Sequence, residues 1–179
     1  MNIIESMVMN KFNSPLACGC GRLFDAVSAI LGICLENTYE GQAAIELGEF
    51  VLDEMYNHPH GQYKYEISGE AIMPTGILEG VVHDHLAGVP VHTISGRFHT
   101  TLVAIITEAV ERVRKKTAIN KVALSGGTFQ NGYLFRETKK ALTNKEFDIL
   151  YHHLVPANDG GISLGQAMVA HWRWKLRTS

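Results

Sequence analysis

KVALSGGTFQN, residues 121–131, is the stretch that decides the fold. Its apolar run at residues 122–124 is typical of a short buried strand, and Ser125-Gly126-Gly127 then interrupts that run. The residues from Asn131 to Leu142 have a helical pattern, so a helix is expected there. The sequence therefore predicts a strand, a glycine-containing turn and a helix in direct succession.

VPANDGGISLGQ, residues 155–166, has the same order of features. A second short strand is predicted at Phe147 to Tyr151, Asn158-Asp159-Gly160-Gly161 supplies the turn, and a helix follows from Ile162 to Lys175. Two such units in succession predict a βαβα arrangement in the last third of the chain. Helices dominate the first two thirds, and no repeat or obvious linker divides the chain.

Both turns indicate a binding site. Ligands of open α/β sheets bind just beyond the carboxyl ends of the strands. Glycines let the backbone approach a ligand closely, and a helix N-terminus offers free N–H groups to an anion. One glycine turn alone would be weak support, because most strand-to-helix connections need a glycine. The pair of turns, with Gln130, Asn131, Asn158 and Asp159 beside them, indicates a nucleotide-type pocket.

The composition is that of a folded domain and excludes several function classes. Hydrophobic residues make up 46% of the 179 residues and charged residues 19%, so one well-cored α/β unit is expected. The formal net charge of −2 gives no electrostatic case for nucleic acid or for an anionic membrane. No apolar run approaches the roughly 18 residues that span a bilayer. We therefore expect no nucleic-acid partner and no membrane partner.

Cysteine usage and the first residues favour the cytoplasm. Three cysteines, an odd number, argue against a disulfide framework and for a reducing compartment. MNIIESMVMNKF, residues 1–12, lacks the charged region and the cleavage pattern of a secretory signal. We expect a cytoplasmic protein. The structure of residues 1–13 stays open, because a short strand and a frayed lead-in both fit.

Periodic apolar residues predict the helices of the first two thirds. The longest, Thr93 to Lys116, keeps a 3.6-residue period almost throughout, and His99 is expected on its polar side, in a structural or pocket-facing role. Tyr63, Tyr65 and Ile67 alternate with polar residues, which predicts a half-buried strand. The other predicted segments are a helix from Gly21 that ends or bends at Gly32, a helix at 42–55, a loop at 57–61 and a helix at 77–86.

The sequence does not predict a self-contained metal site. Two histidine ligands on one helix face require a spacing of three or four residues, and none of the nine histidines has such a partner. Cys18-Gly19-Cys20 has no second cysteine pair near it, whereas zinc sites normally use four ligands in two close pairs. The spacing argues for no serine–histidine–aspartate arrangement, and the GxxxxGK[ST] phosphate loop is absent from the sequence.

Two carboxylates have more than one interpretation. Asp159 suits either a helix cap or a contact with a metal or phosphate, because the two glycines behind it leave space around its side chain. Asn158 suits the capping role equally well. Asp25 lies near the first turn of the helix that begins at Gly21, where a carboxylate is usually a surface residue that favours the helix dipole.

Five blocks of the sequence occur in the order found in one known family: SPLACGCGRLFDAVSAILG, TYEGQAAIEL, GRFHTTL, VALSGGTFQNGYL and VPANDGGISLGQA. SGGxFQN together with NDGGISLGQA is a specific combination. From about Asn13 to Ala170 the chain resembles the C-terminal part of HypF, the carbamoyltransferase family of [NiFe]-hydrogenase maturation.

The resemblance implies a fold and a chemistry. The implied fold is α/β, one lobe of an actin-like ATPase (ASKHA, ribonuclease H-like) fold with additional helices. Residues 1–179 would form the C-terminal lobe of a Kae1-like carbamoyltransferase domain. HypF-like proteins form carbamoyl-adenylate from carbamoyl phosphate and ATP, and pass the carbamoyl group to a C-terminal cysteine of HypE. That group later becomes the cyanide ligand of the hydrogenase iron. The implied cofactors are ATP, as carbamoyl-adenylate, and a divalent metal (Mg, Fe or Zn).

The family's binding residues map onto positions of this sequence. By resemblance, Asp25 should contact the ribose hydroxyls, and Asp159 should be a ligand of the active-site metal. The resemblance assigns no catalytic residue in this chain. Gly41 and Glu46 should line the nucleoside side of the pocket, whereas adenosine or its phosphate should be contacted by Gly126, Gly127 and Asn131.

The chain also departs from the family's pattern. HypF proteins are several times longer, with acylphosphatase-like, zinc-finger and YrdC-like regions upstream that nothing here resembles. The family's metal-binding HxxxH pair belongs to the upstream half of the actin-like domain, and this sequence has no HxxxH. CGC before Gly21 replaces the small polar residues expected there. We therefore expect about half of a two-lobed nucleotide site, without carbamoyl transfer by this chain alone.

The expected function is carbamoyl transfer by an enzyme that is incomplete as an isolated chain. Its expected partners are a HypE-like acceptor protein and the missing N-terminal lobe, and an exposed apolar patch should make the chain self-associate. One rival is another actin-like carbamoyltransferase that acts on tRNA or a small molecule, although FQN after the glycines and NDGG favour HypF. The other rival is a non-catalytic remnant or interaction module that keeps the fold.

Overall fold

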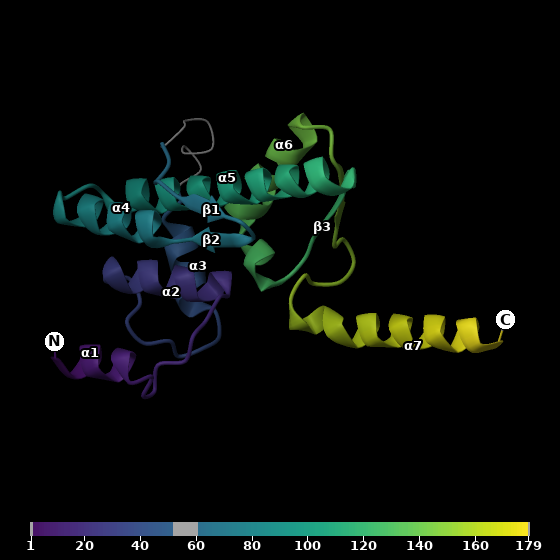
Figure 1. Ribbon diagram of the computed structural model, residues 1–179, viewed down its shortest axis with the longest axis horizontal. Helices are drawn as coiled ribbons and strands as arrows, with labels where there is room; N and C mark the ends of the chain where they lie inside the picture. The colour runs from purple at the N-terminus through teal and green to yellow at the C-terminus, as the bar shows by residue number, and fades with distance from the viewer. Residues whose placement is uncertain (1, 52–60, 179) are drawn as a thin grey trace.

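The computed structural model describes residues 2–51 and 61–178, which form a helical region followed by a short α/β unit (Figure 1). The α/β content predicted from the sequence is confirmed. The elements are α1 (Asn2–Met9), α2 (Cys20–Ile30), α3 (Gln42–Glu49), β1 (Glu66–Ser68), β2 (Ala71–Met73), α4 (Thr75–Leu86), α5 (Val91–Thr117), β3 (Lys121–Leu124), η2 (Gly127–Gln130), α6 (Gly132–Asn144), β4 (Asp148–Tyr151), η3 (Asp159–Gly161) and α7 (Ile162–Thr178).

Helix α5 lies at the centre of the described core. It packs against both α4 and α6, while α2 packs against α3 and α4 (Figure 1). Its apolar side chains recur at helical spacing, with Ile94 and Phe98 fully buried and Leu102 and Ile105 nearly so. The predicted helix Thr93–Lys116 is therefore confirmed. The core around it is formed by Phe24, Val27, Leu31, Leu47, Tyr63, Ile77, Val81, Ile94, Phe98, Leu102, Ile105 and Leu134.

The α/β unit has the predicted order of strand, helix, strand and helix. Strands β3 and β4 pair in parallel, with Leu124 opposite Tyr151 at the end of the register. The crossover through α6 buries Leu142 and Phe147 with Leu124 in a second core. Parallel pairing matters for function, because it places the carboxyl ends of both strands at the same edge of the sheet.

The predicted strand around Tyr63, Tyr65 and Ile67 is shorter than expected and belongs to a hairpin. Strand β1 covers only Glu66–Ser68 and pairs with β2, which the sequence analysis did not predict. Gly69, with a φ of +61°, begins the turn between the two strands. Tyr63 precedes the strand and is buried in the core, and its backbone N–H donates to Oγ1 of Thr101 on α5.

Near the N-terminus two expectations need correction. Residues 2–9 form helix α1, whereas a short strand or a frayed lead-in was expected. Ile4 and Val8 lie one helical turn apart, and Glu5 in the first turn favours the positive end of the helix dipole. Helix α3 ends at Glu49, earlier than the predicted Met55. Residues 52–55 of that prediction and residues 57–60 of the predicted loop lie outside the described residues.

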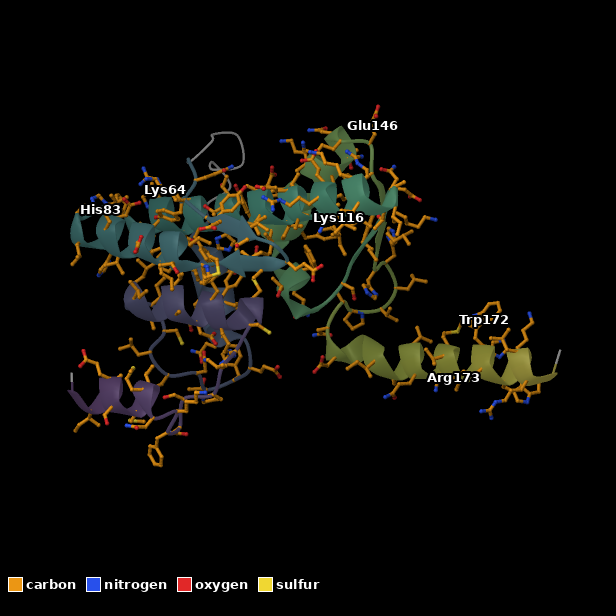
Figure 2. All side chains as sticks on the ribbon, viewed as in Figure 1. Lys64, His83, Lys116, Glu146, Trp172 and Arg173 are labelled. Atoms are coloured by element: carbon orange, nitrogen blue, oxygen red, sulfur yellow. The ribbon has the colours of Figure 1, made fainter. Side chains whose placement is uncertain are left out.

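Helix α7 projects from the rest of the described chain (Figure 1), and Figure 2 shows Trp172 and Arg173 on it, away from the other helices. Every residue from Ile162 to Arg177 is exposed. Within residues 2–51 and 61–178, no helix is long and apolar enough to cross a membrane. The large apolar side chains that α7 leaves exposed are Ile162, Leu164, Met168, Val169, Trp172, Trp174 and Leu176.

Candidate functional site

The two glycine turns predicted to bind a ligand lie against each other at the carboxyl ends of β3 and β4. The backbone N–H of Gly126 donates to the carbonyl of Ala157 at 2.8 Å. One residue earlier, Ser125 Oγ and His152 Nε2 are 2.8 Å apart. Ser125 and His152 each follow the paired residues Leu124 and Tyr151, so the parallel register brings them together. The structure therefore brings together the segments that follow β3 and β4, which are separated in the sequence by helix α6.

The Ser125–His152 pair was missed by the sequence analysis, which found no local serine–histidine arrangement. The two residues are 27 positions apart and meet only through the pairing of β3 and β4, so a search for partners at helical spacing does not find them. The signal that could have revealed it is positional: each residue is the first after a predicted parallel strand. A hollow of about 250 Å³ lies beside the pair, lined by Leu124, Phe129, Gln130, Phe135, His152, Val155, Pro156 and Ala157.

Gly126 and Gly127 form the start of the turn that follows β3. Gly126 has φ +101° and ψ 158°, a conformation that residues with a side chain rarely adopt. A Cβ atom built on either glycine would meet nothing within 4 Å. Open space therefore borders the backbone at both positions, and a ligand can approach it closely. Gly126 also has a local structural reason to be glycine, which is the backbone conformation of the turn itself.

Asn131 is the N-cap of α6. Its Oδ1 accepts a hydrogen bond from the Leu134 N–H at 2.9 Å, and its Nδ2 lies 2.9 Å from Nε2 of His99. A Cβ built on Gly48 of α3 would lie 2.9 Å from Asn131 Nδ2, so the two helices approach closely at this point. The side chain that was predicted to contact adenosine or phosphate is thus held by three elements of the protein.

His99 lies in the core, and the expectation that it occupies the polar side of α5 is wrong. The side chain is fully buried, with the rings of Phe24, Phe98 and Tyr133 centred 5.4, 5.5 and 5.8 Å from the imidazole. Burial lowers the pKa of His99 to about 4, because the charged form would lose its hydration, although the Ser95 carbonyl partly opposes this. The error arose because α5 is covered on two sides, by α4 and by α6, so its inward-facing surface is wider than one apolar stripe.

Asp25 lies in the second turn of α2, somewhat later than the sequence analysis placed it. Arg22 Nη2 is 2.8 Å from its Oδ2, and the Asp25 side chain is 21% exposed. That oxygen is buried and accepts no well-angled hydrogen bond from the described residues, so the ion pair alone neutralises it. A carboxylate oxygen in this state retains the capacity to accept from a hydroxyl group.

Gly41 and Glu46 lie at the start and in the middle of α3, which packs against α2. Gly41 precedes the helix in the left-handed conformation, with φ +78°. Glu46 Oε1 accepts from Gln42 Nε2 at 2.8 Å and remains half-buried. Burial raises the pKa of the Cys34 thiol, and the negative charges of Glu46 and Asp25 add to the effect. Both carboxylates therefore act electrostatically on the same thiol.

Asp159 is exposed and does not cap a helix. Asn158 takes the capping role, because its Oδ1 accepts from the Gly160 N–H at 3.1 Å. Of the two residues that suited the cap, Asn158 is therefore the one that the structure uses. The glycines behind Asp159 do not leave free space, because a Cβ on Gly160 or Gly161 would meet Pro156 at 2.9 or 2.8 Å. The space argument for a metal contact is therefore wrong, while the carboxylate itself faces solvent.

The described residues do not assemble a metal site by themselves. Within residues 2–51 and 61–178 no group of three or more histidine, cysteine, aspartate or glutamate side chains could hold a metal ion. Asp159 can supply one carboxylate oxygen, and a divalent cation needs several more ligands.

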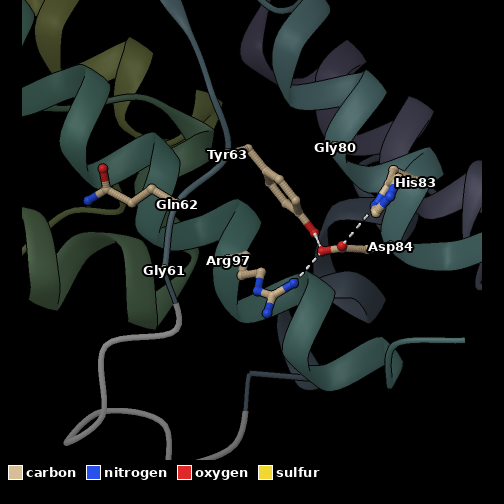
Figure 3. Close-up of a pocket in the computed structure, with 7 residues that line it drawn as sticks. All are labelled: Gly61, Gln62, Tyr63, Gly80, His83, Asp84 and Arg97. Carbon is tan, nitrogen blue, oxygen red and sulfur yellow. Dashed lines mark hydrogen bonds and ion pairs between the residues drawn. The ribbon is translucent and has the colours of Figure 1, made fainter. Parts of the chain in front are cut away.

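A second polar cluster, remote in the sequence from both glycine turns, lines a hollow of about 360 Å³ between α4 and α5 (Figure 3). Asp84 accepts hydrogen bonds from the Tyr63 hydroxyl, at 2.8 Å, and from Arg97 Nη1, and His83 Nδ1 lies 3.5 Å from its other oxygen. A Cβ on Gly80 would collide with the Tyr63 ring, so glycine is needed there. The sequence analysis did not identify this cluster.

The electrostatics of this second cluster are those of a satisfied ion pair. Burial would raise the pKa of Asp84, but the hydrogen bonds from Tyr63 and Arg97 and the charge of Arg97 outweigh it and hold the pKa below its usual range. Burial and the neighbouring Asp84 carboxylate raise the pKa of Tyr63. The cluster therefore fixes the segment before β1 against α4 and α5, and we assign it a structural role.

Comparison with known proteins identifies similar sequences and folds. Residues 1–166 match the family described as carbamoyltransferase, Kae1-like domain, second subdomain. The chain is 34% identical over 94% of its length to a carbamoyltransferase HypF of Rhodobacter capsulatus, and 26% identical over 87% to a tRNA N6-adenosine threonylcarbamoyltransferase of Thermosipho africanus. A crystal structure of full-length HypF in the phosphate- and nucleotide-bound form superimposes with a TM-score of 0.87 and 40% identity over 94% of this chain.

These matches are partial with respect to the longer proteins. The chain spans 22% of the length of the Rhodobacter relative and 22% of the HypF chain in the crystal structure, against 46% of the threonylcarbamoyltransferase. The expected fold class, an α/β lobe of an actin-like ATPase fold, is confirmed by the structural match to HypF and its Kae1-like domain. The predicted resemblance to the C-terminal part of HypF is confirmed as well.

Proposed function

The chain belongs to the carbamoyltransferase family of HypF, as the second subdomain of its Kae1-like domain, and on this basis we propose that it supplies one half of a nucleotide site for carbamoyl transfer. The nucleotide is carbamoyl-adenylate, made from carbamoyl phosphate and ATP. The acceptor is a C-terminal cysteine of a HypE-type protein in [NiFe]-hydrogenase maturation. The chain is an incomplete enzyme in isolation, because it spans only 22% of the length of the Rhodobacter HypF relative.

The contact between the two glycine turns carries this proposal. The Gly126–Ala157 hydrogen bond brings the turn after β3 against the turn that opens α7, at the carboxyl ends of two parallel strands. The start of α6 lies beside the same turn, and helix N-termini favour phosphate through free N–H groups and a positive dipole. This arrangement supports nucleotide binding better than it supports catalysis by a side chain.

The nucleoside half of the site would be formed by α2 and α3. Asp25 would accept hydrogen bonds from the ribose hydroxyls, displacing Arg22 from a carboxylate that has no other hydrogen-bond donor among the described residues. Gly41 and Glu46 would line the nucleoside side. Asp25 and Glu46 lie on α2 and α3, which pack against each other, and this packing supports their sharing one ligand.

The phosphate half would be formed by the turn after β3. Gly126 and Gly127 border open space, so an adenosine or phosphate group can approach their backbone. Asn131 would contribute from the start of α6, where its Nδ2 has a second N–H that no described residue uses. These roles position the adenylate, and positioning is a large part of catalysis for phosphate esters and anhydrides.

The metal contact is the least complete part of the proposed site. Asp159 would supply one oxygen to a divalent cation (Mg, Fe or Zn), and the remaining ligands would come from outside the described residues, from the other lobe of the domain. When bound, such a cation would neutralise negative charge on the phosphate. The role of this chain is then to present an exposed carboxylate at the mouth of the nucleotide pocket.

The proposed partners follow from the same incompleteness. The first partner is the N-terminal lobe that the 22% coverage of HypF relatives leaves unaccounted for, and the second is a HypE-like acceptor protein. A cytoplasmic location is proposed with them, since the chemistry concerns an intracellular enzyme. Exposed apolar residues on α7, including Trp172 and Leu176, offer a surface for association.

A second candidate function is carbamoyl transfer to a different acceptor. The similarity to the threonylcarbamoyltransferase of Thermosipho africanus supports this candidate, and the name of that enzyme specifies a tRNA adenosine as its acceptor. The identity to HypF proteins is higher, and HypF supplies the confirmed structural match. The net charge of −2 does not favour RNA as a partner. We therefore rank the HypE-type cysteine first.

Reconstitution tests the proposal. A HypF enzyme shortened by the region that corresponds to this chain would be mixed with the chain, and carbamoylation of a HypE-type C-terminal peptide would be followed by mass spectrometry. The wild-type chain should restore transfer, Asp159→Ala should not, and neither half should act alone. Formation of a stable complex without any transfer to the cysteine, or transfer to tRNA in its place, would contradict the proposed acceptor.

A further inference from the structure

A series of hydrogen bonds crosses the protein interior from α6 through α5 to α3. The Leu134 N–H donates to Asn131 Oδ1 at 2.9 Å, and Asn131 Nδ2 donates to His99 Nε2 at 2.9 Å. His99 Nδ1 then donates to the Ser95 carbonyl at 2.8 Å, and Ser95 Oγ donates to the Leu47 carbonyl at 2.8 Å. We call these four bonds the His99 relay. They link the three helices α3, α5 and α6.

The direction of every bond in the His99 relay is determined. The Leu134 N–H can only donate, so Asn131 must present Oδ1 to it and turn Nδ2 toward the imidazole. Nε2 of His99 must then accept, while the Ser95 carbonyl can only accept and so requires the proton on Nδ1. Only the neutral imidazole with its proton on Nδ1 satisfies both neighbours. Burial of the ring favours the same neutral form.

The His99 relay ends on the elements that carry the proposed nucleotide contacts. At one end, Asn131 caps α6 directly after the Gly126–Gly127 turn. At the other end, Leu47 is adjacent in sequence to Glu46 on α3. The imidazole is the middle member, and the rings of Phe24 and Tyr133 contact it edge to face, with their centroids 5.4 and 5.8 Å away. Loss of the acceptor at Nε2 would therefore remove a hydrogen bond from the Asn131 side chain.

The geometry points to His99 as a positioning residue for nucleotide binding, one that orients the Asn131 amide and fixes the start of α6 relative to α3. The inference rests on the proposed function, in which Asn131 and Glu46 contact the same nucleotide. Because an amide is planar, a bond from one N–H of Nδ2 to His99 sets the direction of the second N–H. That second N–H is the group available to a ligand.

The test compares three variants of the full chain. His99→Phe keeps an aromatic ring of similar size but removes the acceptor at Nε2, and His99→Gln restores an amide oxygen near that position. Leu102→Ala is the matched control, since Leu102 is buried on α5 one turn later and belongs to no relay bond. Two readouts are taken on each sample: the ¹⁵N and ¹H shifts of the Asn131 side chain and the Gly126 and Gly127 amides, and titration of those signals with ATP and Mg²⁺.

We expect His99→Phe to shift the Asn131 side-chain signals and the Gly127 amide signal. The variant should also weaken ATP binding about tenfold, because one well-oriented hydrogen bond is lost. His99→Gln should bind within about threefold of the wild-type chain. Leu102→Ala should lower the melting temperature without moving either readout. The double variant with Asn131→Ala and His99→Phe should bind ATP as strongly as Asn131→Ala alone, because both substitutions act through the same amide.

Three results would overturn the inference. One is an equal loss of affinity in His99→Phe and Leu102→Ala, which would mean that general destabilisation explains both. Another is a His99→Gln chain that behaves like His99→Phe, and the third is full additivity with Asn131→Ala. If no sample binds ATP, the proposed function fails, whereas the shifts of the unliganded samples still decide whether His99 orients Asn131 and the turn.

Discussion

Asn131 donates from Nδ2 to Nε2 of His99 across 2.9 Å, and this bond joins the cap of α6 to the buried core of the helical region. The cap oxygen and the buried nitrogen belong to residues 32 positions apart. A capping asparagine usually contributes about 1 kcal/mol to its own helix alone. Here the same side chain also links the proposed nucleotide turn to α5, so changes at His99 are expected to affect both stability and binding.

The stability of the chain should fall as the pH decreases from about 6.5 to about 4. His99 has an ordinary pKa of 6.5 when unfolded and about 4 in the fold, because burial disfavours its charged form. Between these values the unfolded state binds a proton that the folded state does not. The free energy of unfolding therefore falls by up to about 1.4 kcal/mol for each pH unit by which the pH is lowered. Urea denaturation at pH 7, 6 and 5 measures this slope.

His99→Gln is the control for that pH dependence, because it cannot take up the proton. Carboxylates with lowered pKa values, such as Asp84, remain in both proteins and lose their contribution only as the pH falls through still lower values. The free energy of unfolding should therefore fall more steeply with decreasing pH in the wild-type chain than in His99→Gln between pH 6.5 and 5. Parallel curves over that interval would contradict the assignment of a neutral buried His99.

Alanine at the two neighbouring glycines should separate folding from binding. Gly126 has φ +101° and ψ 158°, so Gly126→Ala should destabilise the chain by about 1–3 kcal/mol through backbone strain. Gly127→Ala places its Cβ in open space and should change stability by less than about 0.5 kcal/mol. Its methyl group would nevertheless obstruct a nucleotide that approaches the backbone. Thermal denaturation and ATP titration of both variants check this, and unchanged ATP affinity in Gly127→Ala would exclude a phosphate contact there.

The Asp84 cluster should be structural. Asp84→Ala removes the acceptor of both the Tyr63 hydroxyl and Arg97 and should destabilise the chain by about 2 kcal/mol, since two partly buried donors lose a bond. Tyr63→Phe removes only one of these bonds and should lower stability by about 1 kcal/mol. Urea denaturation measures both. ATP affinity should be the same in all three chains, and its selective loss in Asp84→Ala would show that the cluster belongs to the binding site.

The strand–turn–helix units could be predicted from the sequence because their signals are local. The apolar run at 122–124, the glycines that end it and the period of α5 each depend on neighbouring residues, and the structure has all three. The hairpin strand β2 was missed because its three residues are exposed and show no alternation of buried and exposed positions. Helix α1 was missed because its apolar side chains, such as Ile4 and Met9, cover no core that would give them a clear pattern.

The contacts within the site could not be predicted, since they depend on tertiary packing. Ser125 and His152 meet only because β3 and β4 pair in a parallel register. His99 was placed on the wrong side of α5 because its polarity suggested exposure, whereas a neutral imidazole with both nitrogens bonded is compatible with the core. Whether the residues carried over from the family contact a nucleotide stays a prediction.

Helix α7 should make the chain associate with itself when its usual partner surface is absent. Its exposed apolar residues include Val169, Trp172 and Leu176, each more than half exposed, and they have the character of an unfilled interface. Light scattering should show a mass that rises with concentration. Trp172→Ser with Leu176→Ser should keep the chain monomeric, whereas Arg173→Ser should not. A monodisperse monomer at high concentration in the wild-type chain would refute this prediction.

The most direct test of the central claim is a calorimetric titration of the chain with ATP and Mg²⁺, run beside Asp25→Ala and Arg22→Ala. Both variants break the Arg22–Asp25 ion pair, but only Asp25→Ala removes the proposed ribose contact. The account predicts saturable heat for the wild-type chain and for Arg22→Ala, and none for Asp25→Ala. No saturable heat in the wild-type chain, or equal heat in all three, would contradict it.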